Sequence, residues 1–252
     1  MNVDAKPSSL RVRTVIGLLF GVVSGLFIST SARSGMWQDN FDSGDLRDYE
    51  IFNLDRAVEG WDLKDGTVVG EIFAPHAYSL LILKPRGKRP ENWTDYSVRV
   101  RAKLLDTKKK DVEPRLGLSL YDQEFEGNRY LTLVAPNLNE LHIVRVTNDV
   151  WQIIPFAFPV PQDEWIELTA TIETMEDVES VTFQVNDGPE LRIRAASPLR
   201  AGKVGLVVRD AVVAFDDLVI EGETIPNGGR GVVRPVSPRG RAAVRWAELK
   251  AR

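Results

Sequence analysis

The chain has 252 residues, of which 43% are hydrophobic and 27% charged, which is the composition of an ordinary folded protein with room for one sizeable domain. It has no cysteine, and this excludes disulfides, thiolate metal sites and a cysteine nucleophile. The net charge of −4 is unevenly distributed, because residues 33–224 carry 22 basic and 34 acidic side chains. Such an acidic domain repels phosphate backbones, so we expect no nucleic acid among its partners.

Residues 1–32 have the features of an export segment. Lys6, Arg11 and Arg13 precede an apolar run at residues 15–28, which has the length of a signal peptide's hydrophobic region and is followed by small residues. Cleavage after Ala32 is one outcome, and an uncleaved membrane anchor helix is the other. In both cases the sequence predicts an exported protein, located in the periplasm, at the cell surface or outside the cell, which contacts the membrane if the segment is retained.

Residues 37–223 form a series of short predicted strands. Asp65-Gly66 and Asn186-Asp187-Gly188 are hairpin signals between apolar runs. Residues 96–104 alternate apolar and polar side chains, as a half-buried strand does. Turn signals at short intervals, with no helical period between them, predict an all-β fold with two antiparallel sheets packed as a β-sandwich.

Two further features of this region carry structural expectations. Trp61 and Trp165 are expected to be core aromatics under the sheets. In the last predicted strand, residues 212–220, the apolar side chains change parity. That change predicts a β-bulge near Asp216 and Asp217, or burial on both faces.

The composition changes after Glu223. Residues 224–241 are rich in proline, glycine and arginine, which predicts a flexible basic linker. Residues 242–252 are a short basic tail. The tail is either a helix that docks weakly on anionic lipid, polymer or protein, or a frayed solvated end.

Several sequence landmarks follow one another along the middle of the chain. They are DNFDSGDL (39–46), GWDLKDGTVVGE (60–71), NWTDYSVRVRAKL (92–104), WIELTATIE (165–173), VTFQVNDGPEL (181–191) and GKVGLVVRDAVVAFDDLVI (202–220). This series resembles bacterial laminin G-like and concanavalin A-like jelly-roll domains, and in particular the group that contains 3-keto-disaccharide hydrolase domains. The resemblance implies a jelly roll with a concave sheet, but it does not place that group's catalytic residues on this sequence.

Five residues are candidates for a ligand-binding site. In the resembled fold the middle strands line the concave sheet, where aromatic faces stack on sugars and arginine donates hydrogen bonds. The alternative is that these residues are ordinary strand side chains, half in the core. The candidates are Arg115, Tyr121, Tyr130, His142 and Trp151.

Catalytic motifs are scarce. Sandwich glycosidases use closely placed carboxylates, and those of the laminarinase kind carry them as Glu-x-Asp-x-x-Glu, which this sequence lacks. The nearest pattern is Glu124 and Glu126, whose ordinary interpretation is a solvated acidic loop. Since His76 and His142 are the two histidines, a zinc site of three histidines is impossible.

A second acidic group is spread between the two ends of the domain. It contains Asp39, Asp42, Asp216 and Asp217. Some related jelly rolls hold a structural calcium ion where the first and last strands meet, and carboxylate oxygens suit calcium. The alternative is that the two aspartates at the bulge cap backbone amides. A calcium site at Asp39, Asp216 and Asp217 is therefore one expectation, and no other cofactor is indicated.

Three functions remain open. The leading hypothesis is an exported non-catalytic module that binds carbohydrate or another cell-envelope polymer through its concave sheet. The second, implied by the resemblance, is a glycoside-processing enzyme of the 3-keto-disaccharide hydrolase type. The third is a structural envelope interaction protein whose basic tail makes the contact.

Overall fold

The structure is a computed structural model that describes residues 34–54, 60–72, 77–107, 112–123 and 127–231. The predicted export segment, His76, Glu124, Glu126 and the basic tail lie outside these residues. Within the described ranges no helix is long and apolar enough to cross a membrane.

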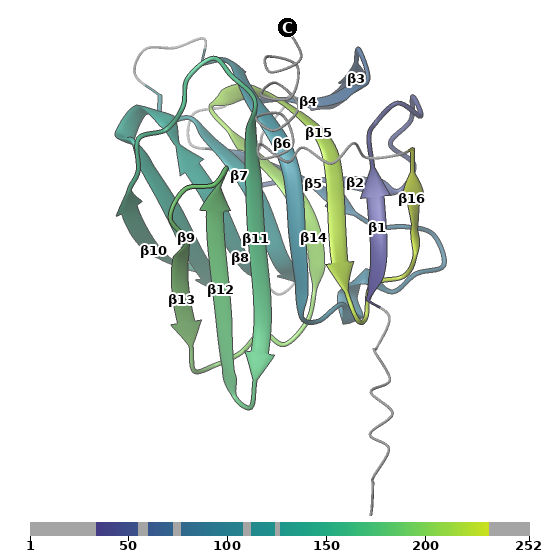
Figure 1. The fold of residues 1–252 in the computed structure, drawn as a ribbon, viewed down its shortest axis with the longest axis vertical. Coiled ribbons are helices and arrows are strands. Elements are labelled where there is room, and N and C mark those ends of the chain that lie inside the picture. Colours follow the sequence, from purple (N-terminus) through teal and green to yellow (C-terminus); the bar gives the residue numbers. More distant parts are fainter. Residues whose placement is uncertain (1–33, 55–59, 73–76, 108–111, 124–126, 232–252) are drawn as a thin grey trace, which may run out of the picture. The chain divides into compact units, whose positions relative to one another are not determined.

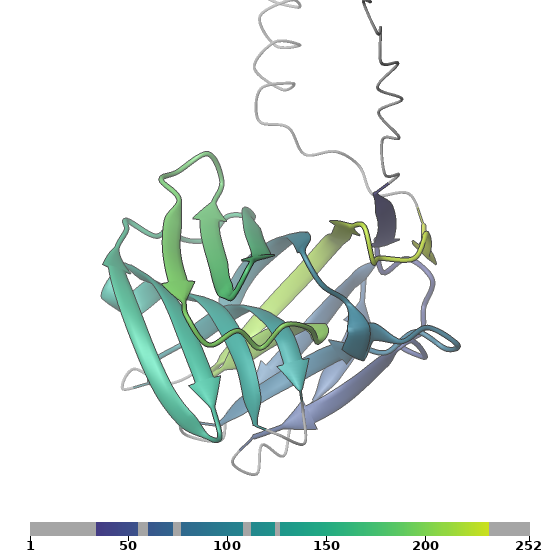
Figure 2. The same cartoon turned by 90° about the horizontal axis from the view of Figure 1, so that it is seen from below.

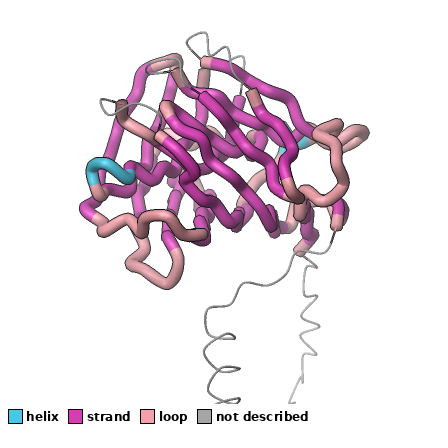
Figure 3. The backbone as a smooth tube through the Cα atoms, turned by 90° about the horizontal axis from the view of Figure 1, so that it is seen from above, coloured by secondary structure: helices cyan, strands magenta, loops and turns pink. Residues whose placement is uncertain are grey.

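The described chain is built almost entirely of β-strands in two stacked sheets (Figures 1 and 3). Nearly all strand pairs are antiparallel, which confirms the predicted β-sandwich. Two single-turn 3-10 helices, η1 (Pro90–Asn92) and η3 (Pro136–Leu138), interrupt the series of strands.

The two sheets contain nine and seven strands. The nine-stranded sheet has the order β13 (Leu191–Ala195), β12 (Val178–Val185), β11 (Ile166–Met175), β6 (Tyr96–Asp106), β15 (Ala211–Gly222), β1 (Gly35–Asp39) and β16 (Gly228–Arg230), with β4 (Thr67–Ile72) paired to β15 and β3 (Trp61–Lys64) to β4. The seven-stranded sheet has the order β10 (Val150–Ala157), β9 (Glu140–Thr147), β8 (Asn128–Ala135), β7 (Arg115–Gln123), β14 (Lys203–Arg209), β5 (Tyr78–Leu83) and β2 (Tyr49–Asn53).

The main hydrophobic core lies between the two sheets. On β6, Val98 and Val100 point into it and are fully buried, whereas Arg99 and Arg101 alternate with them on the outer face. This is the alternation read from the sequence at residues 96–104. Burial of one face per strand at roughly 25 cal/mol per Å² of apolar surface is what holds such a sandwich together.

The seven-stranded sheet carries a second hydrophobic cluster on its outer face. Its members alternate along each strand with residues of the main core, so the central strands are buried on both faces. β5 is buried at all six positions for this reason. The cluster consists of Tyr78, Leu80, Ile82, Leu131, Leu133, Val144, Val146 and Val207.

This sheet is strongly curved (Figure 2), and side chains of strands far apart in it touch across its concave outer face. Trp151 on β10 and Tyr78 on β5 stack with ring centroids 5.2 Å apart, although four strands lie between them. Arg129 on β8 lies 5.2 Å from the ring of Phe52 on β2. The curl therefore encloses the second cluster, and the protein's own apolar side chains fill the concave face.

Two local predictions about the backbone are confirmed. Asp65 and Gly66 form the β3–β4 turn with φ angles of 51° and 73°, the left-handed geometry that a tight hairpin requires. The pairing of β15 with β6 shifts between Asp216 and Val219, and Asp217 has a φ of 52°. This is the β-bulge expected from the change of parity.

The two tryptophans differ in position. Trp61 lies in the main core and donates its Nε1–H to Oγ of Ser79 over 2.9 Å. Trp165 instead packs on the outer face of the nine-stranded sheet, against Val69 and Val212. The expectation that Trp165 lies under the sheets was wrong, because it precedes β11 and keeps outward parity with Glu167.

The domain extends past its predicted end at Glu223. Ile225 is 3% exposed in the main core, and β16 pairs in parallel with β1. The guanidinium of Arg230 forms ion pairs with Asp45 and Asp48. The predicted flexible linker thus begins too early, because its first residues complete the sheet.

Candidate functional site

The structure separates the five predicted ligand-binding residues into two groups. Arg115, His142 and Trp151 lie on the concave face of the seven-stranded sheet. Tyr121 and Tyr130 lie in the main core on the opposite side of the same sheet. The placement of these two tyrosines on the concave face is therefore corrected.

Tyr121 changes sides because of a bulge. The pairing of β7 with β8 shifts between Leu120 and Gln123, and Tyr121 has a φ of 47°. Its ring packs edge-on against Tyr96 with centroids 5.4 Å apart, and its hydroxyl accepts a hydrogen bond from Asp95 N–H over 2.8 Å. Burial raises the pKa of Tyr121 to about 12. The residue is thus a core anchor.

Tyr130 is also an interior anchor. It is fully buried, and its hydroxyl donates to Oε2 of Glu179 over 2.8 Å. The same carboxylate accepts backbone N–H groups from Leu199 and Arg200 at 2.8 and 2.5 Å. Burial raises the pKa of Tyr130 well above its usual range. These bonds connect β8 to the segment before β14 and leave no polar atom of Tyr130 for a ligand.

On the concave face, the half-exposed ring of Trp151 starts a connected series of contacts. Trp151 is 37% exposed and rests on Tyr78, which is buried beneath it. The guanidinium carbon of Arg209 lies 5.2 Å from the centroid of the Tyr78 ring, and Arg209 Nη1 donates to the Tyr78 hydroxyl over 3.3 Å. The aromatic pair is thereby fixed in position by a charged group.

Arg115 and Arg209 are neighbours on adjacent strands. They are opposite each other in the β7–β14 pairing, and Tyr78 is opposite Arg209 on β5. Both guanidinium groups contact Glu113, at 3.2 Å from Arg115 and 3.8 Å from Arg209. Arg115 is 4% exposed, and burial lowers its pKa.

His142 and Glu140 complete the series on β9. His142 Nε2 lies 2.8 Å from Oε2 of Glu140, whose side chain is 32% exposed. Glu140 lies opposite Ala135 on β8, so one strand separates this pair from Arg115 on β7. We call the set of six residues the concave-face cluster: Tyr78, Arg115, Glu140, His142, Trp151 and Arg209.

The concave-face cluster offers three kinds of interaction on one face of the sheet. A tryptophan face can stack on apolar C–H surfaces, guanidinium groups donate hydrogen bonds, and a carboxylate accepts them. Sequence reasoning missed Tyr78, Glu140 and Arg209. The sequence did contain a signal for Arg209, because a charged residue directly follows the apolar run at residues 204–208. The pairing of β14 with β7 then puts Arg209 opposite Arg115.

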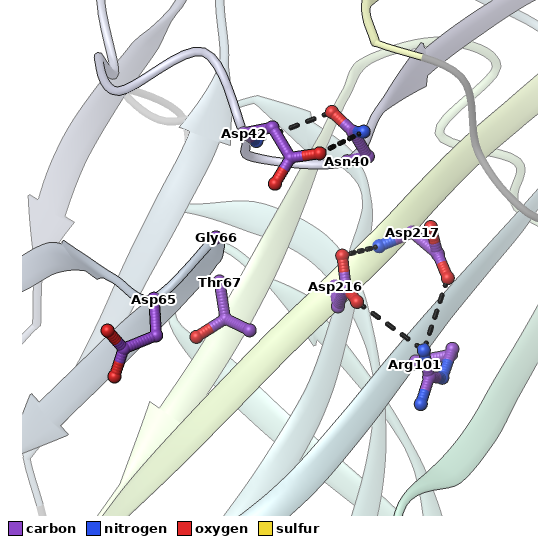
Figure 4. A pocket seen from close by; sticks show the side chains of 8 residues that line it. All are labelled: Asn40, Asp42, Asp65, Gly66, Thr67, Arg101, Asp216 and Asp217. Carbon is purple, nitrogen blue, oxygen red and sulfur yellow. Dashed lines mark hydrogen bonds and ion pairs between the residues drawn. The ribbon is translucent and has the colours of Figure 1, made fainter.

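A second site is a polar pocket of about 460 Å³ at the outer face of the nine-stranded sheet (Figure 4). Arg101 Nη1 lies 3.4 Å from Oδ2 of Asp216 and 3.3 Å from Oδ2 of Asp217. Burial and the charge of Asp217 raise the pKa of Asp216, while Arg101 opposes the rise. The lining residues are Asn40, Asp42, Asp65, Gly66, Thr67, Arg101, Asp216 and Asp217.

The residues expected to bind calcium are only partly brought together. Asp216 and Asp217 line the pocket, but Asp39 does not. Asp39 is 1% exposed and accepts hydrogen bonds from Phe41 N–H at 2.8 Å and the Tyr49 hydroxyl at 3.1 Å. No group of three or more acidic or histidine side chains within the described ranges is placed to hold a metal ion. The calcium site stays an expectation of the sequence.

No protein-family model and no curated protein sequence matches this chain. Among solved structures, a carbohydrate-binding module from Bacillus subtilis aligns at 15% identity with a TM-score of 0.53, over 68% of this chain and 95% of that one. An endo-1,3-β-glucanase from Streptomyces sioyaensis aligns at 11% identity and a TM-score of 0.51, over 74% and 96%. A Bacillus licheniformis β-glucanase aligns at 10% identity and 0.50, over 75% and 98%. The domain thus has the concanavalin A-like jelly-roll fold.

Proposed function

We propose that the domain binds carbohydrate without catalysis, at the concave-face cluster. The observation that carries the proposal is Trp151, whose ring remains 37% exposed while Tyr78 supports it from below. A large aromatic ring held at the surface by a second ring is the platform that a sugar ring stacks on. Arg115 and Arg209 hold the ring pair in position from behind, and Glu140, whose side chain is 32% exposed, is a polar group on the same face of the sheet.

The fold is consistent with this proposal but does not carry it. One solved structure of the same fold is a carbohydrate-binding module and others are glucanases. Because one fold hosts many functions, the choice between them rests on the side chains of the site.

We also propose that binding takes place outside the cytoplasm. The support is the apolar run at residues 15–28 behind three basic residues. A cell-envelope polysaccharide would be the natural ligand in that location. Fractionation of cells that produce the full chain tests this part: recovery in the cytoplasmic fraction would contradict it.

The experiment for the binding proposal is a panel of polysaccharides probed with the full chain. We expect retention on at least one polysaccharide, and loss of that retention in Trp151→Ala. Phe156→Ala is the matched control, because Phe156 lies on the same strand and is also 37% exposed but has the opposite parity. Retention on no polysaccharide, or equal loss in both variants, would overturn the proposal.

One observation favours the enzymatic alternative. His142 Nε2 and Glu140 Oε2 lie 2.8 Å apart, which couples a histidine that can accept a proton to a carboxylate on the concave face. A carbonyl at C3 of a sugar acidifies the proton at C2, so a base placed there promotes departure of the group at C1. Incubation with a 3-keto-glucoside tests this activity. Turnover that His142→Ala abolishes would establish it, and an inactive wild-type protein would remove it.

A further inference from the structure

The edge strand β10 differs from the other strands that end a sheet. Natural proteins protect exposed strand edges with charged side chains or with proline, because an unprotected edge pairs with other strands. β10 consists of Val150–Ala157, none of its eight residues is charged, and Pro155 is its one protective residue. The remaining described edges follow the rule: Arg192 and Arg194 lie on β13, Glu50 on β2, Asp62 and Lys64 on β3, and Arg230 on β16.

The exposed side chains of β10 include apolar ones on both faces of the sheet, and Gln152 is its one polar residue. Ile153 is 55% exposed on the concave side, where its partner on β9 is Val144 of the second cluster. Val150 is 70% and Phe156 37% exposed on the opposite side. An apolar strand that is open on both faces gains by burial against another strand.

The backbone of β10 has donors and acceptors directed away from its sheet. Asn148 and Asp149 form a two-residue turn with φ angles of 50° and 61°, so Thr147 and Val150 exchange both backbone hydrogen bonds. From this register, alternate residues bond to β9, and Trp151, Ile153 and Pro155 direct their backbone groups outward. Pro155 fits this position, since it has no N–H to leave unpaired.

We propose that two copies of this chain pair through β10, antiparallel and about a twofold axis, to form one continuous sheet. The partner is a second copy because β10 is neutral within an acidic region of 22 basic and 34 acidic residues. The net negative charge of residues 33–224 makes two copies repel each other, and β10 adds no charge to that repulsion. An antiparallel strand pair is self-complementary, as a twofold interface must be.

Pro155 selects the register of the pairing. With Ile153 opposite Ile153 of the partner subunit, the two residues exchange both backbone hydrogen bonds, and Trp151 N–H meets the carbonyl of the partner's Pro155. Because Pro155 has no N–H, the carbonyl of the partner's Trp151 opposite it receives no backbone hydrogen bond. This happens once at each end of the paired segment, and water can bond to the carbonyl there. The two concave faces lie on the same side of the joined sheet.

The first test measures the mass of the full chain by analytical ultracentrifugation, in a mild detergent because of the apolar run at residues 15–28. Between about 1 and 100 µM we expect a concentration-dependent dimer. Ile153→Lys should halve the observed mass. The control is Ile51→Lys, because Ile51 is 46% exposed on β2, the other edge of the same sheet, and should remain dimeric. A monomeric wild type, a dimeric Ile153→Lys or a monomeric Ile51→Lys would overturn the proposal.

The second test uses the absence of cysteine from the chain. Ile153→Cys introduces a single thiol, and the twofold axis places it opposite its own copy at a separation that a disulfide bridges. Mild oxidation should give a covalent dimer on a non-reducing gel. Ile51→Cys should remain monomeric on that gel. Equal cross-linking of the two variants would indicate random collision and would contradict the register.

Discussion

Trp151 and Tyr78 stack with ring centroids 5.2 Å apart, across a sheet that puts four strands between them. This contact closes the curl of the seven-stranded sheet over its second hydrophobic cluster. The two rings therefore fill the concave face between β10 and β5, and a ligand meets the aromatic pair at its rim.

The Trp151–Tyr78 contact should contribute measurably to stability. An aromatic pair is worth about 0.5 to 1.5 kcal/mol beyond simple burial, so Trp151→Ala should lower the free energy of unfolding by about 1 kcal/mol or more. Urea denaturation followed by circular dichroism measures the change. Phe156→Ala removes an equally exposed ring that forms no ring pair within the described residues, and should cost less. Equal costs would show that the stacking adds nothing.

Tyr130 should matter for folding and not for binding. Tyr130→Phe removes the hydroxyl that donates to Glu179 at 2.8 Å, in a place where both groups are fully buried. We expect a loss of about 1 to 3 kcal/mol in stability, since a buried acceptor loses one of its donors. Retention of the folded variant on any polysaccharide that the wild type binds should not change. A selective loss of retention would return Tyr130 to the binding site.

Asp39 should give the domain a distinct pH dependence. Burial raises its pKa above the ordinary value of 3.8, and the hydrogen bonds from Phe41 and Tyr49 only partly oppose the rise. Because the folded state then holds the proton more tightly than the unfolded state, the stability contributed by this group falls as pH rises from about 3.8 through the folded-state pKa.

The comparison with Asp39→Asn isolates this effect. The amide keeps an acceptor for Phe41 N–H and has no charge to bury. Relative to the variant, the wild type should therefore be more stable at about pH 4 than at about pH 7. Denaturant unfolding at a series of pH values measures the difference. A difference that is constant with pH, or that grows as pH rises, would contradict the burial argument.

Calcium should have little effect on the polar pocket. Arg101 already provides the positive charge for Asp216 and Asp217, at 3.4 and 3.3 Å. Since a bound ion would raise the melting temperature by mass action, we expect calcium chloride at about 1 mM to shift it by less than about 1 °C. A larger rise that Asp216→Asn abolishes would establish the calcium site that the sequence suggested.

Local sequence patterns predicted much of the sandwich. The alternation on β6 and the Asp65-Gly66 turn both reflect interactions within a few residues, and the structure confirms them. The bulge at Asp216 was visible because the apolar residues around it change parity. The strand β16 was missed because three residues, two of them glycine, show no period.

The candidate site was harder to predict, because it depends on curvature. Arg115, His142 and Trp151 were identified from their strand positions, but Trp151 meets Tyr78 and its neighbour Arg209 only through the curl of the whole sheet. Tyr121 was misplaced because a bulge reverses its face, and a tyrosine with a φ of 47° gives no sequence signal. Glycine or asparagine would have been the expected residue for that backbone.

The pairing of β1 with β15 also bears on the order in which the chain acquires its structure. Trp37 lies opposite Ile220, so the first strand has no partner in the nine-stranded sheet until almost the entire domain has been synthesised. The entropy of closing so long a loop delays this contact relative to the hairpins β7–β8 and β8–β9. We expect β1 to dock last and to remain accessible to proteases and chaperones until it does.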